Sequence, residues 1–314
     1  MVAAPRRQAS YDASLPLRVQ AIQPRTAKLY RLSFRRFSSY VWNHSRLLVS
    51  SIPVAHLDSH FEAFVDWEAQ RHGGRQRQRC VNALQGVFLV MGEHLRSMFP
   101  SSHRALAAWR RRVPSVSAPP LPEYWCDVLT SLLLLKGKVD SGLALFLSFH
   151  GLLRASEVLS LRGNDVLVRS SHPEHGGIRV RHAKTGRLQF ARIQEPMVLR
   201  VLHYLALTTP ASELLFPSVD YRGYVADLRW ACRALRLPVI FTPHSARHGG
   251  ATARFLRGDS PSVIRIAGRW SQYHSMEVYL QACACLLLNF NPPPEFSLLL
   301  STGFVLRPLL LTFL

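Results

Sequence analysis

The sequence predicts a mainly α-helical protein with a small antiparallel β-sheet, an α+β fold of two domains. Apolar residues recur at helical spacing through most of the chain, and three short strand patterns follow one another between residues 166 and 193. A proline-rich stretch over 113–122 cannot continue a helix, so it predicts a linker between the domains. With 314 residues, 48% of them hydrophobic, the chain can bury a core in each domain.

The charge balance predicts a polyanionic partner. The chain has 39 Lys and Arg residues against 19 Asp and Glu residues, a formal net charge of +20. Such an excess on a globular chain is typical of proteins that bind nucleic acid. The cysteines are odd in number and lack the spacing of metal ligands, which predicts buried, reduced thiols and no metal site. They are Cys80, Cys126, Cys232, Cys283 and Cys285.

The first domain is predicted to be helical and to span 20–112, after a flexible N-terminus over 1–19. Its first helix, over 26–41, should bury an apolar face between basic residues. That face consists of Leu29, Tyr30, Phe34, Phe37 and Val41. Helices are also predicted over 54–71 and 79–98.

Basic residues gather on the first helix and in a predicted turn over 73–79. We interpret them as a clamp on the DNA backbone, because Lys and Arg are the side chains that neutralise phosphates. A solvated, charged surface on a helical bundle is the alternative. The residues are Lys28, Arg31, Arg35, Arg36, Arg75, Arg77 and Arg79.

The second domain is predicted to span 123–285 and to contain the sheet. The almost wholly apolar helix over 141–153 should be buried in its core. Directly after this helix come Arg154 and, three residues later, Glu157, so a carboxylate lies within reach to hold the guanidinium. The alternative to a functional arginine here is a purely structural Arg–Glu pair. The other predicted elements are helices over 123–136, 196–207 and 221–235 and strands over 166–169, 178–182 and 188–193.

Two further stretches can present cations to a ligand. Lys184 lies in a Lys-Thr-Gly turn that joins two strand patterns as a hairpin. Thr242 and Pro243 are a helix-start signal, and Gly258 is a stop signal. His244 and Arg247 then stand at i and i+3 on the first turn, so their side chains and the helix N-terminus should face one spot suited to a phosphate.

Together these motifs resemble the tyrosine recombinases, also called the phage integrase family. Arg154-Ala-Ser-Glu157 resembles the first arginine box, Lys184 the lysine of the strand turn, and His244-Ser-Ala-Arg247 the His-x-x-Arg box. Trp270 stands where the family has His or Trp, and Tyr279 follows it by nine residues, at the spacing of the family's nucleophile. The resemblance extends over residues 143–279 and is weaker before them.

The resemblance implies a role for each residue of these boxes. Arg154 and Arg247 would stabilise the negative charge of a five-coordinate phosphate, to which the guanidinium fork is well matched. Tyr279 would attack the phosphorus and form a 3′-phosphotyrosyl link, assisted by His244. Lys184 would protonate the departing 5′-oxygen.

The two remaining residues would support the site. Trp270 would pack against it and donate its indole N–H to the phosphate, with an ordinary core tryptophan as the alternative. Glu157 would support the arginine box. The resemblance implies a reaction that needs no metal and no small-molecule cofactor, and the sequence has no phosphate-binding glycine loop or metal-spaced cluster.

The function that follows is DNA cleavage and rejoining, with double-stranded DNA as the partner. The resemblance implies site-specific recombination or integration by a homotetramer on two DNA sites, for a mobile element. A type IB topoisomerase or a hairpin-forming resolvase is the rival with the same chemistry. A DNA-binding relative that has lost catalysis is the rival of a different class.

The stretch over 286–314 departs from the family's pattern. Residues 296–314 are nearly all apolar, yet they fall just short of the roughly 20 residues that a spanning helix needs. A peptide that docks on a partner, or a tail altered by a shifted reading frame or unspliced sequence, is favoured over a membrane anchor. Because the N-terminal residues also lack an apolar core of signal-peptide length, we expect an intracellular protein located with DNA, in a eukaryotic nucleus or a prokaryotic cytoplasm.

Overall fold

The chain divides into two compact units on either side of the bond between Val116 and Ser117. The computed structural model describes residues 22–72, 74–113, 118–168, 175–181, 188–193, 195–237 and 240–277. The boundary between the units lies within residues 113–122, while the role of each unit remains a prediction.

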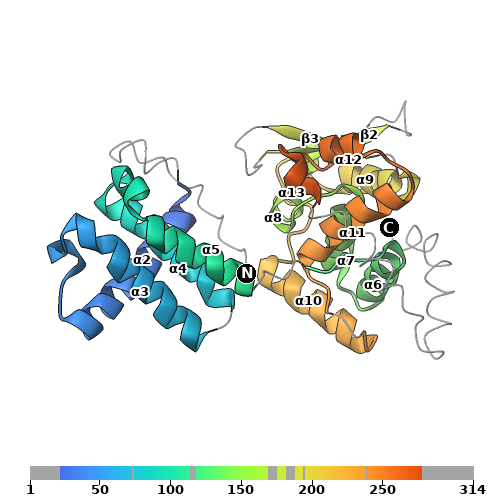
Figure 1. Cartoon of the computed structure of the whole chain (residues 1–314). Coiled ribbons are helices and arrows are strands. Elements are labelled where there is room, and N and C mark those ends of the chain that lie inside the picture. The colour runs from blue at the N-terminus through green and yellow to red at the C-terminus, as the bar shows by residue number, and fades with distance from the viewer. Residues whose placement is uncertain are drawn as a thin grey trace. The chain divides into compact units, whose positions relative to one another are not determined.

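The described part of the first unit is a bundle of the helices α2 to α5 (Figure 1). Their bounds are α2 (Pro24–Ser45), α3 (Val54–Arg71), α4 (Gly74–Met91) and α5 (Pro100–Arg112), with short 3-10 helices η1 (Val49–Ser51) and η2 (Glu93–Met98) between them. Aromatic rings fill the core: the Phe37 ring lies 4.8 Å from that of Phe61 and 5.5 Å from that of Phe64. Aromatic pairs at these distances add stability beyond the area that they bury.

Three expectations for this unit are wrong in detail. Residues 74–79 are the first turns of α4 rather than a turn between helices, and the helix predicted over 79–98 breaks after Met91. Gly92 adopts φ +129°, a conformation that ends the helix and that residues with a Cβ rarely adopt. Leu29 is exposed, because the buried face of α2 consists of Ala27, Ser33, Phe37 and Val41 instead. The helix α5 was not foreseen.

In the second unit, helices and a small sheet surround one large apolar core. The sheet is antiparallel with strand order β1-β2-β3, and its register pairs Val166 with Ile178 and Arg179 with Phe190. The mainly α fold with a small antiparallel sheet is therefore confirmed. The elements are α6 (Glu123–Leu135), α7 (Val139–His150), α8 (Ala155–Val158), η3 (Gly163–Asp165), β1 (Val166–Val168), β2 (Gly176–Val180), β3 (Gln189–Ile193), α9 (Pro196–Thr208), α10 (Tyr221–Ala234), α11 (Pro243–Leu256), α12 (Pro261–Ala267) and α13 (Tyr273–Glu277).

Helix α11 runs through the middle of this unit, against α7 (Figure 1). Its start is as predicted: Thr242 is the N-cap, Pro243 is the first helical residue, and Gly258 adopts φ +96° just after the end. Ser245 Oγ accepts a hydrogen bond from the Thr242 N–H at 3.0 Å, which holds the first turn.

Two adjacent glycines let α11 approach its neighbours closely. A Cβ at Gly249 would lie 1.8 Å from the carbonyl oxygen of Leu121, and a Cβ at Gly250 would lie 2.0 Å from that of Phe149. Both approaches are too close for any other residue, so the glycines set how deeply α11 sits in the core.

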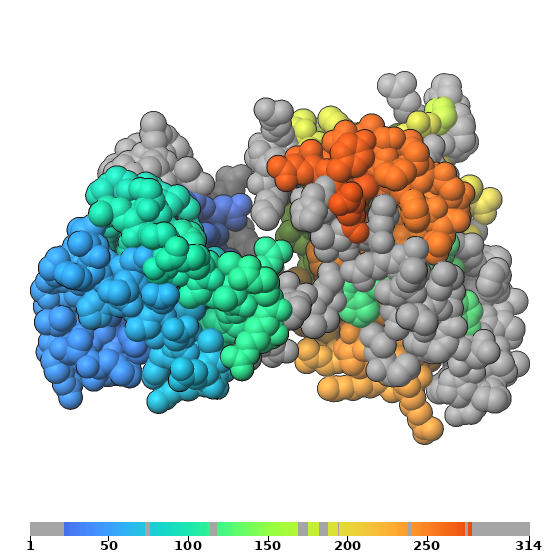
Figure 2. All heavy atoms as spheres, in the orientation of Figure 1, coloured from blue at the N-terminus to red at the C-terminus, as the bar shows by residue number. Residues whose placement is uncertain are grey.

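Helices α12 and α13, orange and red in Figure 2, lie on the surface of the unit, where Ile266 is 70% exposed.

The described cysteines, Cys80, Cys126 and Cys232, are buried thiols, as expected; Cys283 and Cys285 lie outside the described residues. Among the described helices, none has the length and apolar character needed to cross a membrane. The stretches over 1–19 and 286–314 also lie outside what the structure describes.

Candidate active site

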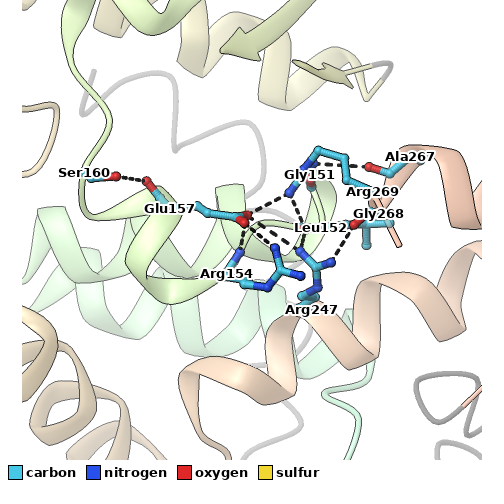
Figure 3. Close-up of polar contacts among 9 residues, drawn as sticks. All are labelled: Gly151, Leu152, Arg154, Glu157, Ser160, Arg247, Ala267, Gly268 and Arg269. Carbon is cyan, nitrogen blue, oxygen red and sulfur yellow. Dashed lines mark hydrogen bonds and ion pairs between the residues drawn. The ribbon is translucent and has the colours of Figure 1, made fainter. Parts of the chain in front are cut away.

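The predicted site forms around the carboxylate of Glu157, which is buried to 2% exposure (Figure 3). The apolar helix α7 ends at His150, and the chain turns through Gly151 and Leu152 before α8 begins. At the start of α8 the Arg154 N–H donates to Glu157 Oε2 at 2.9 Å, and Arg154 Nη1 donates to Oε1 at 2.5 Å. The Arg154 side chain keeps 28% of its surface exposed, so this guanidinium can meet a ligand from solvent.

Arg247 reaches the same carboxylate from α11, but its side chain is wholly buried. Its Nη1 lies 3.7 Å from Glu157 Oε2 and donates to the Leu152 carbonyl at 2.5 Å. Its Nη2 donates to the Gly268 carbonyl at 2.5 Å. Of the two residues expected to face one spot suited to a phosphate, His244 is exposed while Arg247 is buried beneath the surface.

A third arginine, Arg269, completes the cluster and was not foreseen. Its Nη2 donates to Glu157 Oε2 at 2.8 Å and to the Leu152 carbonyl at 3.0 Å. In the sequence Arg269 was simply the neighbour of Trp270, and no spacing pattern distinguished it. Leu152 adopts φ +49°, and its carbonyl accepts from both Arg247 and Arg269.

The electrostatics of the cluster favour an anion. Three guanidiniums from α8, α11 and the turn after α12 surround one carboxylate, so positive charge exceeds negative charge in a largely buried place. Burial alone would raise the pKa of Glu157, but the charge of Arg269 and the hydrogen bonds and charge of Arg154 outweigh it and lower that pKa. Glu157 is therefore ionised at neutral pH, and the surplus charge stays positive.

Two histidines stand beside the arginines on α11. The His244 and His248 rings are 4.7 Å apart in an edge-to-face arrangement. Desolvation lowers the pKa of His244, although the residue as a whole is exposed, and the charges of Arg247 and Arg154 lower it further. Burial, then the charges of His244 and Arg247, lower the pKa of His248 to about 3. Both imidazoles are therefore neutral at pH 7, and a neutral imidazole can accept a proton.

Trp270 closes one side of the cluster. It is 6% exposed and packs with Leu152, Ala251, Ile264 and Met276 in a small apolar group of its own. The guanidinium carbon of Arg247 lies 4.5 Å from the centre of a Trp270 ring. Trp270 also covers Gly268 so closely that a Cβ there would lie 1.6 Å from the indole.

The structure thus brings Arg154, Glu157, His244, Arg247 and Trp270 together from distant parts of the second unit. Lys184, Tyr279 and the side chain of Arg75 lie outside the described part of the chain. No cluster of three possible metal ligands occurs among the described residues. The missed glycines, Gly249 and Gly250, did carry a signal, since paired glycines inside a helical pattern often mark close packing.

The predicted basic surface of the first unit is partly available to a ligand. Lys28, Arg31 and Arg35 are exposed on α2, and Arg79 is exposed on α4, whereas Arg77 is half-buried. Arg36 is tied to the buried carboxylate of Glu68, with Nε to Oε1 at 2.5 Å and Nη2 to Oε2 at 3.1 Å. Its first role is therefore within the bundle.

No model of a known protein family matches the chain, and no curated protein does. Among solved structures it is similar to the Tn1549 transposon integrase bound to transposon right end DNA, at 13% identity and a TM-score of 0.55, over 92% of this chain and 96% of that one.

Two more solved structures are similar to the chain. The Tn1549 integrase bound to circular intermediate DNA has 14% identity and a TM-score of 0.52, over 83% of this chain and 98% of that one. The XerA recombinase has 15% identity and a TM-score of 0.43, over 87% and 93%. The agreement with the integrase shows a shared fold, so the resemblance seen in the sequence is confirmed at the level of the fold.

Proposed function

We propose that the protein cuts and rejoins DNA strands through a 3′-phosphotyrosyl intermediate on Tyr279. The observation that carries the proposal is the arrangement of Arg154 and Arg247 around buried Glu157, with His244 beside them. Surplus positive charge in a largely buried place stabilises a phosphate whose charge grows in the transition state. The shared fold with an integrase solved on DNA supports the same substrate.

In this mechanism the partly exposed Arg154 binds the non-bridging oxygens of the scissile phosphate directly. Arg247 contributes its charge from beneath, where the carbonyls of Leu152 and Gly268 and the Trp270 ring hold it. Fixed cations of this kind need little rearrangement when the negative charge develops, which is why preorganised sites accelerate such reactions.

The covalent step is a transfer of the phosphoryl group between two oxygens. The Tyr279 hydroxyl oxygen attacks phosphorus and gives its proton to neutral His244. The bond from phosphorus to the 5′-oxygen breaks, and Lys184 gives that oxygen a proton. Because the phosphotyrosyl bond retains the energy of the original bond, a 5′-hydroxyl from another strand can reverse the step without ATP.

A nicked duplex that loses its short 5′-hydroxyl fragment tests this reaction. Incubated with the protein in a metal chelator, it should yield a covalent protein–DNA adduct, and Tyr279→Phe should abolish the adduct while DNA binding persists. Tyr273→Phe is the matched control, because Tyr273 belongs to the same segment and contacts Arg265 rather than the arginine cluster. An adduct that survives Tyr279→Phe would contradict the assigned nucleophile.

The second candidate is a DNA-binding protein without catalysis. It is favoured by one observation: Arg247 has no exposed surface, and both its terminal nitrogens donate to backbone carbonyls. Tight binding without adduct over a library of candidate DNA ends would support this candidate. Relaxation of supercoiled DNA without regard to site would instead support a topoisomerase.

We further propose that the reaction serves recombination or integration of a mobile element by four protomers on two DNA sites. The integrase that shares the fold was solved on transposon DNA and on a circular intermediate, which supports this substrate. Mass photometry of the protein with DNA from the flanks of its gene should detect a complex of four chains and two duplexes. A complex that stops at one chain per duplex would contradict tetramer assembly.

A further inference from the structure

The guanidinium of Arg269 is buried and donates four hydrogen bonds to the residues around it. Its side chain is only 4% exposed. Besides Glu157 Oε2 and the Leu152 carbonyl, it binds the Gly151 carbonyl at 3.4 Å and the Ala267 carbonyl at 3.2 Å, both through Nη1 (Figure 3). One guanidinium therefore joins the turn after α7, the first turn of α8 and the end of α12.

The backbone at Arg269 shows that this placement is specific. Arg269 adopts φ +58°, in the left-handed region that residues other than glycine rarely occupy. The four hydrogen bonds of the guanidinium hold it there. A glycine would adopt the same backbone conformation without them.

The two carboxylate oxygens of Glu157 accept hydrogen bonds from different donors, and this indicates what Arg269 does. Oε1 accepts from Arg154 Nη1, while Oε2 accepts from Arg269 Nη2 and from the Arg154 N–H. Arg269 thus anchors one oxygen of the carboxylate, and the other is presented to the Arg154 side chain. Arg247, whose Nη1 is 3.7 Å from Oε2, is too far away to replace it without moving.

We propose that Arg269 is a positioning residue of the phosphate site: through Glu157 it orients the Arg154 guanidinium toward the DNA phosphate. The inference rests on the proposed function, because it assigns Arg269 a part in the same reaction. Arg269 itself does not touch the phosphate. Its loss removes one of the two hydrogen bonds that hold Glu157 Oε2 and leaves only the one from the Arg154 N–H, so the carboxylate is less firmly oriented. The Arg154 guanidinium, which is bound to the other oxygen, then loses its fixed orientation as well.

The test is a double-mutant cycle on the rate of adduct formation from the nicked duplex. Arg269→Gly is the informative variant, because glycine keeps the left-handed backbone and removes only the guanidinium. Arg154→Lys keeps the charge at the site and removes the fork. Misplacing a catalytic group by about 1 Å costs roughly 10²-fold in rate, so Arg269→Gly should slow adduct formation by about 10²-fold while DNA affinity is retained.

If Arg269 acts through Arg154, the two effects do not multiply: the Arg269→Gly, Arg154→Lys double variant should react as slowly as the slower single variant. Added guanidinium ion should restore part of the rate of Arg269→Gly and leave the wild type unchanged, which a variant that had simply unfolded would not show. Arg265→Ala is the matched control, because Arg265 belongs to the same segment and binds the Trp270 carbonyl without contacting Glu157. It should react like the wild type.

The results that would refute the proposed function differ from those that would refute only the role of Arg269. A wild-type protein that binds DNA and forms no adduct refutes the proposed function itself. A wild-type protein that forms adduct refutes only the role of Arg269 if Arg269→Gly is equally fast, or if its effect multiplies with that of Arg154→Lys.

Discussion

The guanidinium carbon of Arg247 lies 4.5 Å from the centre of a Trp270 ring, although the two residues belong to different segments of the second unit. A buried cation over an aromatic face gains electrostatic energy, and this one also fills the space between α11 and the turn after α12. The cation and the ring therefore stabilise one another, so changes at Trp270 should affect both the fold and the site.

Trp270→Ala should lower the free energy of unfolding by about 3–5 kcal/mol, the usual cost of removing a large buried aromatic side chain. Trp270→Phe should cost less, because a ring face remains beneath Arg247. Urea unfolding followed by circular dichroism measures both. Trp230→Ala is the control, since Trp230 is 40% exposed on α10 and its loss should cost much less.

Gly249→Ala should destabilise the protein strongly, because the added Cβ would lie 1.8 Å from the Leu121 carbonyl and must push α11 away from the segment before α6. Overpacking of this kind costs about 1–3 kcal/mol or more. Gly223→Ala in α10 is the matched control, because its Cβ would meet only the Val219 and Asp220 side chains, at 3.3 Å and 3.5 Å. In a helix that change should be neutral or stabilise by up to about 1 kcal/mol. Equal stability of the two variants in urea would contradict this packing.

His248 should make the fold less stable in mild acid. Its pKa in the folded protein is about 3, below the ordinary histidine value of 6.5. Between these values the unfolded chain binds a proton that the folded chain does not, so the free energy of unfolding falls as the pH is lowered below about 6.5. One proton corresponds to at most about 1.4 kcal/mol per pH unit.

Urea unfolding at pH 7.5, 6.5 and 5.5 measures this effect as the difference between the wild type and His248→Gln, which should lose less stability over the range. His175→Gln, which changes an exposed histidine of the same unit, is the matched control. A His248→Gln variant with unchanged pH dependence would show that another group is responsible.

The exposed basic residues of α2 should contribute to DNA affinity by neutralising phosphates. Replacing Lys28, Arg31 and Arg35 together by Gln should reduce the slope of log Kd against log salt by about 0.9 for each phosphate that is no longer neutralised. Fluorescence anisotropy with a labelled duplex at several salt concentrations measures that slope. The matched control replaces Arg110, Arg111 and Arg112, which are exposed on α5 of the same unit. A slope that falls only in the control would indicate that the DNA-binding face is on α5 and not on α2.

Local patterns in the sequence were enough to predict most helices, because capping residues and apolar spacing act over a few residues. The helix α3 begins and ends where its pattern predicted, and Thr242, Pro243 and Gly258 bound α11 as expected. The break at Gly92 was missed because the apolar pattern continues across it and only the positive φ of the glycine ends the helix. The prediction that Leu29 is buried was wrong. A helix has several apolar residues, and tertiary contacts decide which of them form the buried face.

The sequence by itself determined which residue types could form a phosphate site, since arginine, histidine and lysine in those boxes carry the chemistry wherever they lie. Only the tertiary structure decided that Arg247 turns inward under Trp270, that Arg36 pairs with Glu68, and that Arg269 joins the cluster. Arg269 and Glu157 are 112 residues apart. Ion pairs form between side chains within about 4 Å of each other, and over such a separation in sequence only the packing of α7, α11 and α12 brings them that close.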